Sequence, residues 1–144
     1  MNIEIKRIDE ESAYLAAELE KICFSEPWSA QGILDEAERG CFIAAYVGGV
    51  FAGYAGMTAV LDERDICNVA VSPDFRGMGI GKALVGALID DAKKTGASVV
   101  MLEVRKSNSS AIALYEKAGF NLVGQRKNFY NRPREDALLY NYYF

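Results

Sequence analysis

Three glycines within five residues, Gly77, Gly79 and Gly81, separate an apolar run from an amphipathic stretch, and this feature restricts the fold most strongly. The run before them, residues 66–71 (ICNVAV), has the length and composition of a short buried strand. The stretch after them repeats its apolar side chains at helical spacing and ends at Gly96, which suits a helix C-cap. Residues 99–105 follow as another apolar strand. This order of elements predicts a β-α-β unit.

The N-terminal third of the chain predicts one strand and two helices. Ile3, Ile5 and Ile8 alternate as in a strand, and Asp9 can cap a helix that continues to about Ile22. The apolar residues expected on one face of this helix are Leu15, Leu19, Ile22 and Cys23. A second helix is expected from Ser29 to Gly40.

A central hairpin and the C-terminal elements complete the predicted pattern. Gly48-Gly49 lies between two strand-like runs, which is typical of a β-hairpin. Residues 111–118 predict a short helix, and residues 120–124 and 137–144 predict the last strands. We therefore expect a single domain over residues 1–144. Its predicted class is α+β, with a mixed, mostly antiparallel central sheet and helices on both faces.

Composition excludes several classes of function. The chain has no histidine, which removes Ser-His and Cys-His nucleophile pairs and the commonest zinc ligand, and no metal site is predicted. The net charge of −4 argues against nucleic-acid binding. No apolar run is long enough to span a membrane, and the first residues do not resemble a signal peptide, so a soluble cytoplasmic protein is expected. Nothing in the sequence predicts an oligomeric state.

The three cysteines, Cys23, Cys41 and Cys67, each lie in an apolar run, and none of them is at metal-ligand spacing from another. They are expected to be buried free thiols.

The glycine turn itself indicates a phosphate or diphosphate ligand. Glycines allow the backbone to approach a ligand closely, and the first N–H groups of the following helix are free to bind an anion. A Walker A loop is excluded because position 76 is Arg and position 83 is Ala. A dinucleotide-binding fingerprint is excluded because position 82 is Lys. The alternative is a turn without any ligand.

The segment from Arg76 to Gly81 (RGMGIG) resembles the Arg/Gln-x-x-Gly-x-Gly/Ala loop of the GNAT superfamily of N-acetyltransferases. The resemblance implies acetyl-CoA as cosubstrate. It implies that the diphosphate of CoA is bound by Arg76, Gly77, Met78, Gly79, Ile80, Gly81 and Lys82. It also implies that the pantetheine arm pairs with the backbone of Val69, Ala70 and Val71.

Two residues further along the chain are candidates for acid–base chemistry. Glu103 ends the row that Val99 and Met101 begin on one face of their strand, where partial desolvation suits a general base. An ion pair with Arg105 or a solvated strand end is the alternative. Tyr115 lies two helical turns after Asn108, a candidate N-cap whose amide could also contact a ligand. By itself, Tyr115 is better explained as a core tyrosine whose hydroxyl is satisfied.

Residues 102–120 resemble the signature of the RimI-type branch of that superfamily, the bacterial ribosomal-protein-alanine N-acetyltransferases. The segments PWS (27–29) and REDA (134–137) are similar to that branch as well. The resemblance implies that Glu103 is the general base, Tyr115 the general acid and Asn108 a CoA contact.

The same resemblance places Trp28 and Tyr130, the latter in a polar loop, beside the acceptor. Trp28 could instead form a hydrophobic staple with Ile33. The implied acceptor is the N-terminal α-amino group of a protein, and specifically the N-terminal alanine of a small-subunit ribosomal protein. A lysine or small-molecule amine acceptor, or a non-catalytic acyl-CoA-binding module, are the alternatives.

Overall fold

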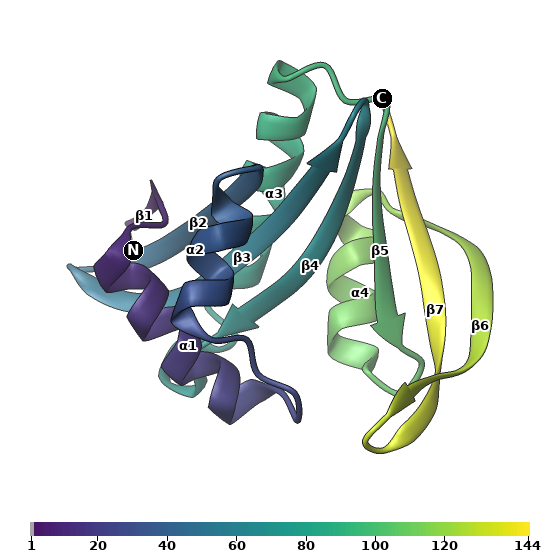
Figure 1. The fold of residues 1–144 in the computed structure, drawn as a ribbon, viewed down its shortest axis with the longest axis horizontal. Coiled ribbons are helices and arrows are strands. Elements are labelled where there is room, and N and C mark those ends of the chain that lie inside the picture. Colours follow the sequence, from purple (N-terminus) through teal and green to yellow (C-terminus); the bar gives the residue numbers. More distant parts are fainter. Residues whose placement is uncertain (1) are drawn as a thin grey trace.

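The computed structural model describes residues 2–144, which form a seven-stranded sheet in the order β1-β2-β3-β4-β5-β7-β6 (Figure 1). The strands are β1 (Ile3–Arg7), β2 (Gly40–Val47), β3 (Val50–Val60), β4 (Glu63–Val71), β5 (Val99–Arg105), β6 (Asn121–Asn131) and β7 (Arg134–Tyr143). The helices are α1 (Glu10–Cys23), α2 (Ala30–Ala37), α3 (Ile80–Lys94) and α4 (Ser109–Ala118), and a short 3₁₀ turn covers Pro73–Phe75. Among the strands of residues 2–144, only β4 and β5 pair in parallel, and α3 lies in the connection between them. The predicted mixed α+β class and the β-α-β unit are therefore confirmed.

The alternation of side chains along the strands builds one core on each face of the sheet. In β2, Cys41, Ile43 and Ala45 join the core beneath α3 and α4. Phe42, between them, belongs to the core beneath α1 and α2. Helices consequently cover both faces, with α1 and α2 on one side of the β1–β4 half and α3 on the other (Figure 1). Within the described residues, no helix is long and apolar enough to cross a bilayer.

The buried face of α1 differs from the expected one. Ile22 is 67% exposed, so its predicted place in the buried stripe is wrong. The residues that α1 buries are instead Ser12, Ala13, Ala16, Ala17, Leu19 and Glu20. Alanines at helical spacing bring α1 close to the sheet, and the polar Glu20 continues the alanine stripe. A search for large apolar residues misses a stripe made in this way.

The parallel strands β4 and β5 stay together for only part of their length. Their paired register runs from Glu63 and Val99 to Ile66 and Leu102. Beyond this point β5 continues along β7, while β4 continues along β3 as far as Val71 (Figure 1). Residues 67–71 therefore have no strand partner on their β5-facing edge within the part of the chain that is described. The two strands form a fork.

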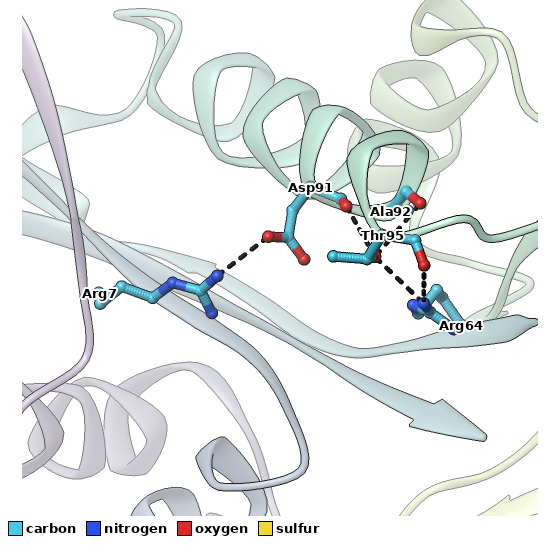
Figure 2. Close-up of polar contacts among 5 residues, drawn as sticks. All are labelled: Arg7, Arg64, Asp91, Ala92 and Thr95. Carbon is cyan, nitrogen blue, oxygen red and sulfur yellow. Dashed lines mark hydrogen bonds and ion pairs between the residues drawn. The ribbon is translucent and has the colours of Figure 1, made fainter. Parts of the chain in front are cut away.

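The glycine turn and a buried arginine fix α3 relative to β4. Gly77 and Gly79 have φ of 77° and 82°, a left-handed conformation that favours glycine. At the opposite end of the helix, Arg64 of β4 is 7% exposed and donates to the carbonyl and hydroxyl oxygens of Thr95, at 3.3 and 3.1 Å (Figure 2). Arg7 of β1 also pairs with Asp91 of α3 at 3.0 Å (Figure 2). Both ends of α3 are thus tied to the sheet.

The last two strands are longer than predicted. The expected bounds were 120–124 and 137–144, whereas β6 extends to Asn131 and β7 begins at Arg134. Tyr130 therefore lies in a strand, and its prediction as a loop residue is wrong. The edge strand β6 exposes most of its side chains, so no apolar alternation marks it in the sequence. Its register also shifts between Arg126 and Tyr130.

We predict that Gly56→Ala destabilises the protein by about 1–3 kcal/mol. A Cβ at Gly56 would overlap the ring of Phe42, which is 2% exposed and has no room to move. Gly86→Ala is the matched control, because nothing lies within 4 Å of the added carbon in α3. It should stabilise the protein by roughly 0.5–1 kcal/mol. Urea unfolding of both variants measures the two effects, and equal midpoints would contradict this packing.

Candidate active site

A cleft of about 560 Å³ opens where β4 and β5 part. Its walls come from the loop after α1, from β4 and β5, from the start of α4 and from the end of β6. Six of the residues predicted from the sequence line it: Trp28, Val69, Glu103, Asn108, Tyr115 and Tyr130. The fold therefore brings into one cleft residues that are up to 102 positions apart in the chain (130 − 28).

Glu103 lies on β5 at the opening of the fork. Its carboxylate faces Arg126 of β6 at 3.9 Å, and the two side chains are 31% and 58% exposed. A long and exposed ion pair of this kind contributes little, so an incoming cation can replace Arg126. The alternative pairing of Glu103 with Arg105 is wrong, because Arg105 pairs with Glu135 at 3.3 Å.

Tyr115 is held rigidly on α4. Its side chain is 7% exposed and packs edge-on against Phe120, with 5.8 Å between ring centroids. Burial raises the pKa of Tyr115 to about 12, and the nearby Tyr130 adds to the shift. The phenol is therefore a neutral hydrogen-bond donor at ordinary pH.

Asn108 begins the same helix, as predicted. Its side-chain oxygen accepts a hydrogen bond from the Ala111 backbone N–H at 3.2 Å. The cap thus orients the start of α4, and Asn108 also faces the cleft. Tyr130, on the other side of the cleft, lies under the guanidinium of Arg105 at 4.3 Å from the ring centroid.

The glycine turn lies at the end of β4 and does not line the cleft. Residues 80–82 are the first turn of α3, and the first backbone bond inside the helix runs from Ala83 N–H to the Gly79 carbonyl at 3.0 Å. Their N–H groups are consequently without partners in the helix. The side chain of Ile80 is only 1% exposed and packs in the core, so only its backbone can meet a ligand. Ala70 is likewise buried, at 2%.

Arg76 connects the turn to both neighbouring elements. Its Nε donates to the Val71 carbonyl at 3.3 Å, and its terminal nitrogen contacts the Cys23 Sγ at 3.6 Å. Burial raises the pKa of the Cys23 thiol. All three cysteines are free, as predicted, but only Cys41 is fully buried, whereas Cys23 and Cys67 line the cleft.

Sequence reasoning missed a second carboxylate and an amide in the cleft. Asp65 of β4 keeps contact with solvent, yet the surrounding protein and the Glu103 carboxylate raise its pKa to about 6, against an opposing effect of Arg126. Asn68 lines the same wall. Asn68 was visible as a polar residue in the predicted strand 66–71, and Asp65 as the residue directly before that strand, but the strand pattern alone does not tell which face they occupy.

Arg105 anchors the end of the β6–β7 hairpin. Its guanidinium donates to the carbonyl oxygens of Pro133 and Arg132 at 2.8 and 3.2 Å. Glu135, its ion-pair partner, also accepts from the Ser107 N–H at 2.6 Å. The pKa of Glu135 is lowered first by the side chain of Ser107 and further by this backbone bond and by Arg105. The wall that carries Tyr130 is therefore fastened to β5 and to the loop before α4.

The sequence of the chain matches a family model described as Acetyltransferase (GNAT) family over residues 7–120. The chain belongs to the GNAT acetyltransferase family. Its enzyme class, predicted from the sequence, is thereby confirmed as an acetyltransferase.

The acetyltransferase also has close curated relatives. It is 39% identical over 127 residues to the [ribosomal protein bS18]-alanine N-acetyltransferase of Escherichia coli strain K12. This alignment covers 86% of each chain. It is 38% identical over 140 residues to the protein of the same name from Haemophilus influenzae, covering 94% of this chain and 93% of that one.

A solved structure resembles the acetyltransferase over nearly its whole length. The crystal structure of the ribosomal-protein-S18-alanine N-acetyltransferase from Escherichia coli aligns with a TM-score of 0.88 and 36% identity. The alignment covers 97% of this chain and 92% of that chain. The predicted resemblance to the RimI-type branch is confirmed.

We predict that Arg105→Ala loosens the end of the β6–β7 hairpin while changing global stability little. The variant removes the contacts to Pro133, Arg132 and Glu135 and the stacking on Tyr130, all near the surface. Hydrogen exchange in residues 127–135 should become faster. Arg134→Ala, which removes an exposed arginine of the same hairpin, is the control and should leave exchange unchanged. Equal protection in both variants would contradict the anchoring role.

Proposed function

We propose that this acetyltransferase transfers the acetyl group of acetyl-CoA to the N-terminal α-amino group of a protein. The acceptor that we infer is the N-terminal alanine of a small-subunit ribosomal protein of the bS18 type. One observation carries the proposal: a single cleft at the fork is lined by Glu103 and Tyr115 together with Trp28 and Tyr130. The names of relatives that are 38–39% identical support the choice of acceptor.

For the donor, we infer that residues 76–82 bind the diphosphate of CoA. The free N–H groups at the start of α3 and the positive end of its dipole favour an anion there. Gly77 and Gly79 leave open space around the turn. Along Val69, Ala70 and Val71 the backbone groups alternate between β3 and the edge without a strand partner, and those on that edge are available to the amides of the pantetheine arm. The Val71 carbonyl also accepts from Arg76. Asn108 would contact the cofactor from the start of α4.

The chemistry of the acceptor favours an α-amine over a lysine side chain. An α-amino group has a pKa near ~8, so a sizeable fraction is already neutral at neutral pH, whereas a lysine near ~10.4 is almost fully protonated. A carboxylate such as Glu103, acting directly or through water, can remove the remaining proton from the first. Its negative charge also attracts the ammonium form.

In the proposed step the neutral amine attacks the thioester carbonyl, forming a C–N bond while the C–S bond breaks. The proton of the amine passes to Glu103. Backbone N–H groups near Val71 would hold the developing oxyanion. Tyr115 donates to the leaving sulfur. A thiol has a pKa near ~8.5, so a phenol with a pKa of about 12 stabilises the thiolate mainly through the hydrogen bond.

We predict acetylation of short peptides with a free N-terminal alanine and none of the same peptides with a blocked N-terminus. CoA release with each peptide, followed by mass spectrometry of the product, measures this. Activity on blocked peptides that contain lysine would favour a lysine acceptor instead. Binding of acetyl-CoA without CoA release for any amine would favour a non-catalytic module.

We predict that Glu103→Gln lowers turnover by ~10²–10⁴-fold, because a general base contributes about that much. Tyr115→Phe should also lower turnover, and both variants should keep the affinity for acetyl-CoA. Glu26→Gln removes another carboxylate of the cleft wall and is the matched control, which should retain most of the activity. An unchanged pH–rate profile in Glu103→Gln would exclude Glu103 as the base. Full activity of Tyr115→Phe would exclude Tyr115 as the acid.

A further inference from the structure

Glu20 of α1 is a carboxylate that is completely buried, with 0% of its surface exposed. Buried carboxylates are rare unless their charge is compensated. Among residues 2–144, no lysine or arginine forms an ion pair with Glu20. Its partners are instead three neutral donors from three different elements. The proposed reaction gives this group no role, and its position therefore requires another explanation.

The three donors converge on the two oxygens of Glu20. The backbone N–H of Trp28 donates to Oε1 at 2.9 Å. The Tyr54 hydroxyl and the Asn68 Nδ2 donate to Oε2 at 2.6 and 2.8 Å. Burial raises the pKa of Glu20, and these three hydrogen bonds oppose that rise by stabilising the ionised form. Charge-assisted bonds of this kind are about twice as strong as neutral ones.

Two of the donors belong to different segments that line the cleft. Trp28 lies in the loop after α1, and Asn68 lies on β4 just beyond the point where β5 departs. Tyr54 of β3 does not line the cleft and is fully buried. Glu20 is thus a bridge behind the cleft, which connects the loop wall to the strand wall, with Tyr54 as its buried support.

The chemistry of the bridge also fixes the orientation of the Asn68 amide. An ionised carboxylate can only accept hydrogen bonds, so the NH₂ group of Asn68 has to face Glu20. The Oδ1 of Asn68 is then the polar atom left for the cleft. A carbonyl oxygen on this wall can accept a hydrogen bond from an ammonium group, whereas an amide NH₂ in its place would repel one.

We propose that Glu20 is a positioning residue for the acceptor amine, which holds the Trp28 loop in place and turns the Asn68 carbonyl oxygen toward the cleft. The inference rests on the proposed function and adds Asn68 as a residue that binds the acceptor. None of the three hydrogen bonds of Glu20 involves the diphosphate turn (residues 76–82), and Asn68 takes part through its side chain, not through the backbone edge of β4. We therefore expect binding of acetyl-CoA not to depend on this network.

Glu20→Gln separates this role from a purely structural one. A glutamine oxygen can still accept from the Trp28 N–H, but its NH₂ group then faces Tyr54 and Asn68. The Asn68 amide must turn over to accept from it and presents NH₂ to the cleft. The KM for an N-terminal alanine peptide should rise by roughly tenfold or more, the effect of losing one charge-assisted hydrogen bond. The KM for acetyl-CoA should stay unchanged.

The double variant Glu20→Gln with Asn68→Asp is the rescue. An aspartate at position 68 accepts from the NH₂ of the new glutamine and again presents an oxygen to the cleft. The KM for the peptide should fall back toward the wild-type value. Tyr54→Phe is the matched control: it removes one hydrogen bond from the same carboxylate and leaves both walls attached. It should lower the melting temperature without changing the KM for the peptide.

Asn68→Ala keeps the proposal testable if Glu20→Gln does not fold, because Asn68 is only half-buried. It should raise the KM for the peptide and leave the KM for acetyl-CoA unchanged. An unchanged peptide KM in Glu20→Gln or in Asn68→Ala would overturn the inference, and so would a rise in Tyr54→Phe as large as in Glu20→Gln. The proposed function itself would fail differently, through absence of peptide acetylation by the wild-type enzyme.

Discussion

Separation of β4 from β5 after Ile66 and Leu102 governs the geometry of the whole site. A continuous sheet would have satisfied the backbone of residues 67–71 with a neighbouring strand. Because the strands part, an edge of β4 stays free and a cleft opens between side chains of the two strands. Glu103 then lines the cleft, where its carboxylate faces the exposed side chain of Arg126. The same separation allows α4 to approach the cleft with Tyr115, since α4 follows β5 and not β4.

The fork can exist only because its two arms are held from outside. On one arm, β5 is paired with β7 along its full length, and Arg105 fastens the hairpin beyond it. On the other arm, β4 is paired with β3, and Arg64 and the glycine turn tie it to α3. Glu20 of α1 contacts this arm through Asn68 of β4, and three hydrogen-bond donors compensate the loss of solvation of its buried carboxylate. Hydrogen bonds of buried polar groups are directional, so they fix the positions of these elements more sharply than apolar contacts do.

Sequence reasoning located the elements better than the faces that they bury. The glycine turn, the caps at Asp9, Ser29 and Asn108 and the turn at Gly48-Gly49 were identified because each depends on local chemistry. The predicted bounds of β6 and β7 were wrong because an exposed edge strand has no apolar alternation. The prediction of the buried face of α1 was wrong because alanines and a buried glutamate form that face. Glu20 could not be found, because a lone glutamate in a helix normally faces solvent, and only the convergence of Trp28, Tyr54 and Asn68 stabilises it inside.

The sequence by itself determined the local structure and the chemical types present: a strand–glycine–helix turn suited to an anion, a carboxylate and a phenol of the types proposed for acid–base chemistry, and no histidine. These follow from short-range sterics and hydrogen bonding, which act over a few residues. Only the tertiary structure decided that Trp28, Asn68, Glu103, Tyr115 and Tyr130 share one cleft, and that Asp65 lies beside Glu103. Such contacts depend on where two strands stop pairing, which is set by the packing of distant elements and leaves no periodic signal in the chain.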